Sequence, residues 1–71
     1  MRRYERAAGT LRVWLRERAM GTVQLARQTG IDPGTIRRIL SGQQSAISTR
    51  NMVALAKFFG MSLRDLMDKL S

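Results

Sequence analysis

Apolar residues recur at helical spacing along most of this chain. Between Tyr4 and Leu15 they fall three and four positions apart, with arginines and glutamates between them, which is typical of an amphipathic helix. Four shorter stretches repeat the pattern, each bounded by glycine or by a residue suited to a helix cap. The pattern predicts helices over residues 5–19, 22–29, 33–41, 49–59 and 63–70.

Start and stop signals support these ranges. Asp32 is suited to cap a helix with its carboxylate, and Pro33 fits the first helical position, where its missing N–H costs nothing. Ile47 before the cap Ser48 follows the hydrophobic-staple pattern, which recurs at Ser62. With no strand pattern, repeat or long loop, the sequence predicts a single all-α domain of 71 residues.

The charge of the chain points to a polyanionic partner. There are 13 basic and 5 acidic residues, giving a net charge of +8, and 11 of the basic residues are arginine. The planar guanidinium group binds phosphate and guanine edges with two parallel hydrogen bonds. We therefore expect the partner to be a polyanion.

Composition also excludes several classes of function. The chain has no cysteine and no histidine, which rules out disulfides, thiolate chemistry, zinc-finger ligation and a histidine acid or base. Five scattered carboxylates provide neither a metal cage nor a general-base pair, so we expect no enzyme activity, cofactor, metal or small-molecule ligand. No apolar run is long enough for a membrane span or a secretory signal, and a cytoplasmic, nucleoid-associated protein is expected.

The most specific motif lies between Thr22 and Ser41. Ala26 is small enough for a close helix crossing, Gly30 permits a left-handed turn four residues later, and Ile36 follows in register. These offsets are the ones that a helix-turn-helix requires. The expected scaffold of the motif is Leu25, Ala26, Gly30, Ile31, Ile36 and Ile39.

From about Leu11 to Met67 the chain resembles the Cro/CI-type helix-turn-helix family (the XRE family), to which the phage lambda repressor DNA-binding domain belongs. Gly42 after the third helix, the run Leu55-Ala56-Lys57 and Gly60 match the pattern of this family. The resemblance implies a five-helix, lambda repressor-like fold. It also implies sequence-specific binding to double-stranded DNA, as a homodimer on a palindromic operator, for transcriptional control and most simply repression.

The same resemblance assigns the expected contacts with DNA. Two base-reading positions of the family fall on Pro33 and Gly34, which have no side-chain hydrogen bonds to offer. We therefore expect the bases to be read by Thr35, Arg37, Arg38 and Gln44, with Arg37 on a guanine. The phosphate-binding position of the family falls on Thr22. The other expected phosphate contacts are Arg27, Ser41, Gln43 and Arg50. For Arg27 and Arg50 a solvated helix face is the alternative, and Arg50 is favoured because it opens the fourth helix, where backbone amides also attract phosphate.

Some positions allow two interpretations. Many family members pair an arginine of the first helix with a glutamate near the end of the third, but Leu40 stands there, leaving Arg16 to solvent or phosphate. The same choice applies to Arg12 and Arg18. The N-terminal arginines form either a DNA-binding arm or a solvated terminus: Arg2, Arg3 and Arg6.

The apolar surface is also open to interpretation. Trp14 and Tyr4 are expected in or beside the core rather than stacked on bases. Phe58 and Phe59 are adjacent and cannot both face one core, so that one of them is expected either to be exposed or to lie at an interface with the fifth helix. The expected dimer interface is Phe58, Leu63, Met67 and Leu70, although Met67 and Leu70 would otherwise simply close the core.

Two other functions compete with a DNA-binding regulator. The same fold serves as a protein-interaction module, such as an antitoxin or an inhibitory subunit, with apolar residues near the C-terminus as its surface. It also serves as the DNA-targeting domain of a recombinase or transposase. Arginines near the third helix favour DNA over an acidic protein partner.

Overall fold

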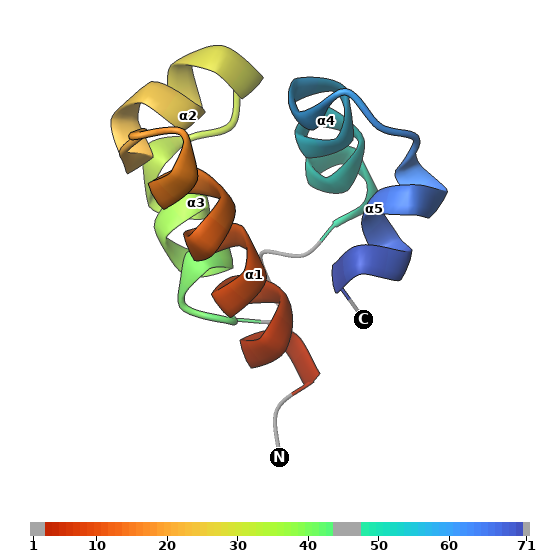
Figure 1. Cartoon of the computed structure of the whole chain (residues 1–71). Coiled ribbons are helices and arrows are strands. Elements are labelled where there is room, and N and C mark those ends of the chain that lie inside the picture. The colour runs from red at the N-terminus through yellow and green to blue at the C-terminus, as the bar shows by residue number, and fades with distance from the viewer. Residues whose placement is uncertain (1–2, 44–47, 71) are drawn as a thin grey trace.

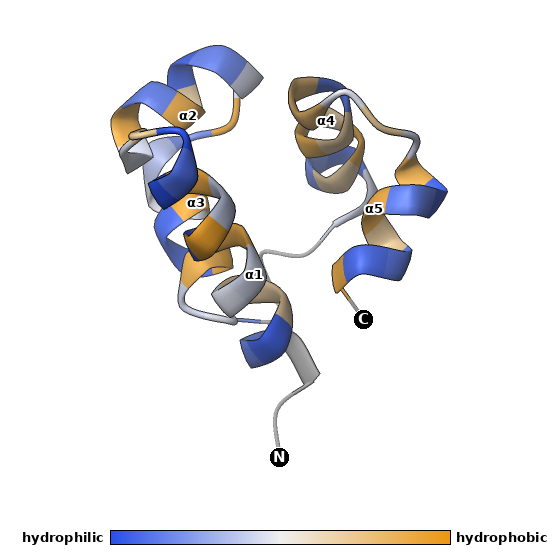
Figure 2. Ribbon diagram, viewed as in Figure 1, coloured by the Kyte–Doolittle hydropathy of each residue, from blue (hydrophilic) through white to orange (hydrophobic). Residues whose placement is uncertain are grey.

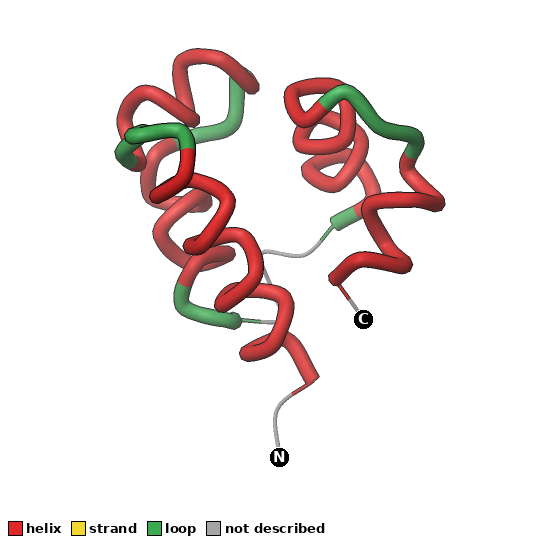
Figure 3. The backbone as a smooth tube through the Cα atoms, in the orientation of Figure 1, coloured by secondary structure: helices red, strands yellow, loops and turns green. Residues whose placement is uncertain are grey.

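The computed structural model of this chain describes residues 3–43 and 48–70. Over these residues it contains five α-helices joined by short loops, with no strand (Figures 1 and 3). The helices are α1 (Arg3–Glu17), α2 (Thr22–Thr29), α3 (Pro33–Leu40), α4 (Thr49–Phe59) and α5 (Leu63–Leu70). The predicted all-α class is confirmed. None of the helices in the described residues is long and apolar enough to cross a membrane.

The first helix ends two residues before the predicted position, 19. Ala19 has φ 53°, in the left-handed region, so that the chain leaves the helix there. The amide of Met20 donates to the carbonyl of Leu15 at 3.0 Å, which closes the helix end. Alanine at this position gave no stop signal, whereas Gly21 did, and the predicted end was therefore too late.

The third helix ends at Leu40 rather than at the predicted 41. Gly42 has φ 82°, and its amide donates to the carbonyl of Ile39 at 3.1 Å. The next amide, of Gln43, donates to Arg38 at 3.0 Å. These two bonds form the closing pattern that a left-handed glycine allows, and they place Ser41 in the cap rather than in the helix.

Serine caps start the last two helices as predicted. The hydroxyl oxygen of Ser48 accepts a hydrogen bond from the amide of Asn51 at 3.1 Å, and that of Ser62 accepts one from Asp65 at 3.0 Å. Ile47, the first residue of the predicted staple at α4, lies outside the described residues.

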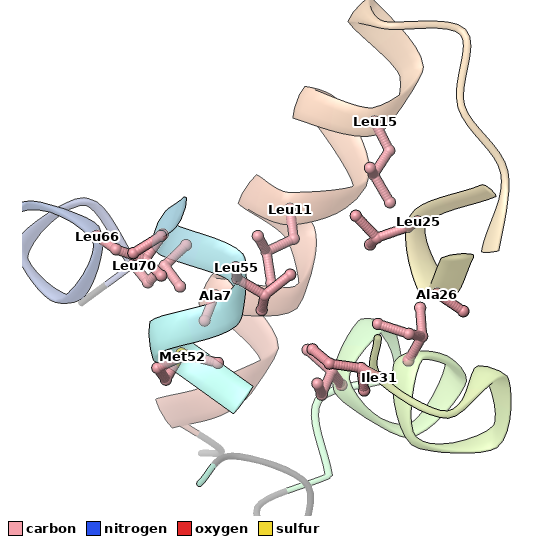
Figure 4. Packing of buried hydrophobic residues seen from close by; sticks show 13 residues of the cluster. Ala7, Leu11, Leu15, Leu25, Ala26, Ile31, Met52, Leu55, Leu66 and Leu70 are labelled. Carbon is pink, nitrogen blue, oxygen red and sulfur yellow. The ribbon is translucent and has the colours of Figure 1, made fainter. Parts of the chain in front are cut away.

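All five helices contribute to one apolar core. Each helix in Figure 2 has both hydrophobic and hydrophilic stretches, as expected of amphipathic helices. α1 packs against α3 and α5, α2 against α3 and α4, and α4 against α5. Figure 4 shows Leu11 and Leu15 of α1 directed towards the side chains of the other helices. The least exposed large side chains are Leu11, Leu25, Ile36, Ile39, Leu55 and Leu66.

Both phenylalanines of α4 pack against this core, so that neither is fully exposed, although exposure was one of the two alternatives predicted for one of them. Phe58 and Phe59 are partly buried, with ring centroids 5.0 Å apart and planes at 76°. The ring of Trp14 meets Phe59 edge-on at 5.0 Å, at the edge of the core as predicted. The side chain of Tyr4 lies outside the described part of the structure.

Candidate nucleic-acid interface

The turn between α2 and α3 has the geometry that the motif predicted. Gly30 adopts φ 76° and ψ 8°, and its amide donates to the carbonyl of Ala26 at 2.8 Å. The hydroxyl of Thr29 reinforces the turn, because it donates to Leu25 at 2.8 Å and accepts from the amide of Ile31 at 3.2 Å. Sequence reasoning had not singled out Thr29, although threonine near a helix end commonly bonds nearby backbone groups.

Next to this turn, α2 and α3 pack against each other through small and branched side chains. The small side chain of Ala26 permits the close approach of α3, and Ala26 is 6% exposed. Ile36 and Ile39 of α3 are buried at 1% and 2% exposure. Each predicted apolar scaffold residue is buried, and the sixth member, Gly30, is the exposed turn residue.

Because Ile36 and Ile39 face the core, the residues between them face outward. Arg37 and Arg38 are both exposed, and Thr35 is partly buried at their N-terminal side. The Nη2 group of Arg38 donates to the Thr35 hydroxyl at 3.2 Å. The structure thus brings three of the four predicted base-reading residues together on α3. The fourth, Gln44, lies outside the described residues.

The N-terminal end of α3 carries one carboxylate, that of Asp32. Asp32 is exposed, and its Oδ2 atom accepts hydrogen bonds from the amides of Gly34 at 2.9 Å and Thr35 at 3.3 Å. A Cβ atom on Gly34 would stand 2.9 Å from this oxygen and 3.8 Å from Nη2 of Arg37. Glycine therefore leaves room, at one edge of the first turn, for both the carboxylate of Asp32 and the guanidinium group of Arg37.

Two of the predicted phosphate-binding arginines lie beside this end of α3. Arg50 lines a shallow depression of about 300 Å³ between the turn and α4, together with Asp32 and Thr35. Arg27 lines a second depression on the α2 side, where Pro33 and Asp32 also lie. Both arginines are exposed. Positive charge thus flanks the tip of α3 on the sides of α2 and α4.

The other predicted phosphate contacts differ in exposure and in hydrogen bonding. Thr22 is the first residue of α2 and is partly buried. Gln43 is exposed after α3. The hydroxyl of Ser41 donates to the carbonyl of Arg38 at 3.0 Å and therefore has a partner within the chain.

Arg12 of α1 and Arg18, which directly follows α1, bind groups within the chain, an outcome that sequence reasoning missed. Arg12 donates from Nη1 to the carbonyl of Leu40 at the end of α3. Arg18 donates from Nη1 to the carbonyl of Trp14 at 3.1 Å, and its guanidinium carbon lies 4.9 Å from the centre of the Phe59 ring. The spacing from Trp14 to Arg18 is a helical signal, whereas 28 residues separate Arg12 from Leu40.

The remaining arginines of α1 are Arg3, Arg6 and Arg16. Arg16 is exposed in the last turn of α1. The helix already begins at Arg3, so that Arg3 and Arg6 belong to α1 rather than to an extended arm. Arg6 is exposed, and Arg2 lies outside the described residues.

The four residues of the expected dimer interface differ widely in exposure. Met67 is 49% exposed, while Phe58 and Leu63 are partly buried against the core. Leu70 is only 7% exposed, because α5 packs this side chain into the core of its own chain. Leu70 therefore offers a second copy almost no surface.

Comparison with known proteins adds one finding. The model of a family described as Helix-turn-helix matches residues 14–66, which include α2, the turn and α3. No curated protein and no solved structure matches the chain.

Within the described residues, no three acidic side chains gather where they could hold a metal ion.

Proposed function

The chain belongs to the lambda repressor-like helix-turn-helix family, a family of DNA-binding regulators, and from this premise we propose that it is a sequence-specific transcriptional repressor. In this proposal α3 enters the major groove of duplex DNA, and a homodimer reads a palindromic operator. Repression follows from occupancy, because a protein bound across a promoter excludes other proteins from the same DNA.

The observation that carries the proposal is the outer face of α3. Arg37 and Arg38 stand exposed on a helix whose other face is fixed by Ile36 and Ile39 in the core. A guanidinium group held on a rigid helix keeps its geometry for a guanine edge, and such a bidentate contact discriminates the wrong base by about 1–3 kcal/mol. Arg37 is the proposed guanine contact.

The flanking arginines supply affinity without sequence preference. Arg27 on the α2 side and Arg50 at the start of α4 are exposed beside the tip of α3. Contacts from such positions to phosphates fix the register of α3 in the groove, while they carry no base information. Arg50 has added support because it lies in the first turn of α4, where backbone amides also attract phosphate.

A homodimer is the proposed assembly. Leu63 and Met67 are four residues apart on α5 and share a face, and Met67 is 49% exposed. A two-fold dimer through this face places two copies of α3 on half-sites about 34 Å apart, which is one turn of DNA.

Selection of bound duplexes from random DNA tests the proposed function. We expect the protein to recover a two-fold symmetric site, and Arg37→Ala to recover the same site with one base position per half-site relaxed. Arg64→Ala on α5 is the control, since it removes an exposed arginine away from α3. Equal recovery of all sequences by the unchanged protein would contradict sequence-specific binding.

A further inference from the structure

The tip of α3 presents a hydrogen-bond acceptor and a set of donors side by side. Oδ2 of Asp32 and Nη2 of Arg37 both lie within 4 Å of the point where a Cβ of Gly34 would stand. Both side chains are exposed. The carboxylate and the guanidinium group therefore occupy the same edge of the first turn of α3.

The carboxylate has acceptor capacity left for a ligand. Both backbone amides, of Gly34 and of Thr35, bond to Oδ2. The Oδ1 atom of Asp32 keeps its lone pairs for an outside donor, while the two amide bonds hold the carboxylate in a fixed orientation. An oriented, exposed acceptor at the tip of a groove-entering helix is suited to reading a base.

We propose that Asp32 is a specificity residue that selects cytosine, beside the guanine contacted by Arg37. This inference rests on the proposed function. Oδ1 accepts a hydrogen bond from the N4 amino group of cytosine, and Arg37 donates to O6 and N7 of guanine. The tip of α3 then reads both members of a C·G pair, or of two adjacent pairs.

The major-groove pattern of the four bases explains the choice of cytosine. Guanine and thymine present only acceptors, O6 and N7 or O4, which a carboxylate repels. Adenine presents an N6 amino group, but its N7 acceptor lies next to it and faces the same carboxylate. Cytosine alone offers an amino donor without an adjacent acceptor.

Gly34 is the positioning residue for this pair. An added Cβ would approach Oδ2 of Asp32 to 2.9 Å, a separation that forces the carboxylate to move. Gly34 itself has no side chain that could contact a base. Its role is to leave the carboxylate of Asp32 in its observed position. Neither Pro33 nor Gly34 has a side chain that can form hydrogen bonds with a base. The polar side chains beside the first turn of α3 that can do so are those of Asp32 and Arg37.

The test is selection of duplexes with Asp32→Asn. Asparagine is as good a helix cap as aspartate, since its carbonyl oxygen accepts the same amide bonds. Its outward group becomes an amino donor, which requires an acceptor on the base. We expect the preference for cytosine, about tenfold in the unchanged protein, to be replaced by a preference for thymine or guanine at that position.

Two further variants separate this role from charge and from folding. Asp65→Asn on α5 removes the same charge at an exposed site away from α3, and it should keep the cytosine preference. Gly34→Ala should lose most of that preference, with the helical circular dichroism signal unchanged. Both aspartate variants should bind all DNA more tightly, because each removes a negative charge.

The outcomes are distinguishable. Identical base preferences for Asp32→Asn and the unchanged protein, with a sequence-specific site in both, would overturn the role of Asp32 and leave the proposed function standing. An effect of Asp32→Asn no different from that of Asp65→Asn would overturn it as well. Failure of the unchanged protein to select any sequence would overturn both proposals.

Discussion

At the scale of single residues, the left-handed backbone positions decide where the helices end. Among the described residues these positions are Gly30, Gly42, Gly60 and one non-glycine, Ala19. A Cβ in this conformation comes close to the following carbonyl oxygen, at a cost of roughly 1–2 kcal/mol. Glycine avoids the clash, but it loses more chain entropy on folding. Ala19 is therefore strained, whereas the other three left-handed positions are occupied by glycine.

Replacing the strained alanine should stabilise the protein. Ala19→Gly relieves the clash at φ 53°, and the greater entropy of glycine in the unfolded chain offsets part of the gain. We expect the free energy of unfolding to rise by about 0.5–1 kcal/mol, or about 2–8 °C in Tm for a domain of this size. Thermal unfolding followed by circular dichroism measures this shift.

The opposite exchange at Gly30 is the matched control. Apart from Gly30 itself and its two chain neighbours, no atom lies within 4 Å of a Cβ added there, so that Gly30→Ala tests the backbone conformation alone. We expect it to lower the free energy of unfolding by about 1 kcal/mol. A rise in stability in both variants, or a fall in both, would contradict the left-handed assignment of one of the two positions.

At the scale of elements, α1 holds α3 in place from its C-terminal end. The last carbonyls of a helix have no partner within the helix and carry partial negative charge. The guanidinium group of Arg12 on α1 donates to one of these carbonyls, that of Leu40. Leu40 stands where the family resemblance implied a glutamate partner for Arg16, and it is the backbone carbonyl of Leu40 that accepts from Arg12. Arg12 is thereby a structural contact of α3.

If Arg12 is a structural contact, replacing it should change the stability of the protein but not the salt dependence of DNA binding. Arg12→Met keeps an apolar side chain but loses the donor, and we expect the free energy of unfolding to fall by about 1 kcal/mol. The slope of log affinity for DNA against log salt should not change. A slope reduced by about 0.9 per protomer would instead identify Arg12 as a phosphate contact. Arg16→Met, at an exposed position of α1, should change stability by less than about 0.5 kcal/mol.

At the scale of the whole molecule, the net charge of +8 is spread over a domain in which acidic residues are few. Flanking arginines on α2 and α4 place part of this charge beside the tip of α3. Binding to a polyanion releases condensed counterions, so that affinity falls as salt rises. The size of this effect reports how many phosphates the assembly neutralises.

Salt dependence therefore provides a quantitative check on the proposed assembly. If each protomer neutralises about five phosphates, log affinity for the selected duplex should fall against log salt with a slope near −9 for a dimer. Fluorescence anisotropy with a labelled duplex at several salt concentrations measures it. An affinity that does not depend on salt would contradict binding to DNA through these arginines.

The exposed face of α5 predicts how the dimer responds to substitution. Met67→Gln removes apolar surface at a 49% exposed position with no change in charge, and we expect the dimer dissociation constant to rise by about tenfold. Sedimentation equilibrium measures this constant. The stability of the single chain should be almost unchanged.

Leu70 provides the contrast on the same helix. Its side chain is 7% exposed, and Leu70→Ala should lower the free energy of unfolding by about 2–5 kcal/mol. An unchanged dissociation constant for Met67→Gln would exclude this face of α5 from the interface.

The helices and the motif were determined by the sequence, because both depend on local order. Helical spacing of apolar residues predicted each of the five elements, with errors only at ends such as Ala19. The turn followed from Ala26 and Gly30, since a close crossing and a left-handed turn each restrict the residue at one position. The outward placement of Arg37 followed from the buried isoleucines of α3.

Other features depended on the tertiary structure, because they join residues that periodicity does not relate. Only packing brings Arg12 to the carbonyl of Leu40, and only the docking of α5 buries Leu70. The tip of α3 is an intermediate case. Sequence predicted Asp32 as a cap, but its common edge with Arg37 depends on the side-chain positions around Gly34. Local order thus specifies the elements, whereas side-chain contacts between and around them decide which charges remain available to DNA.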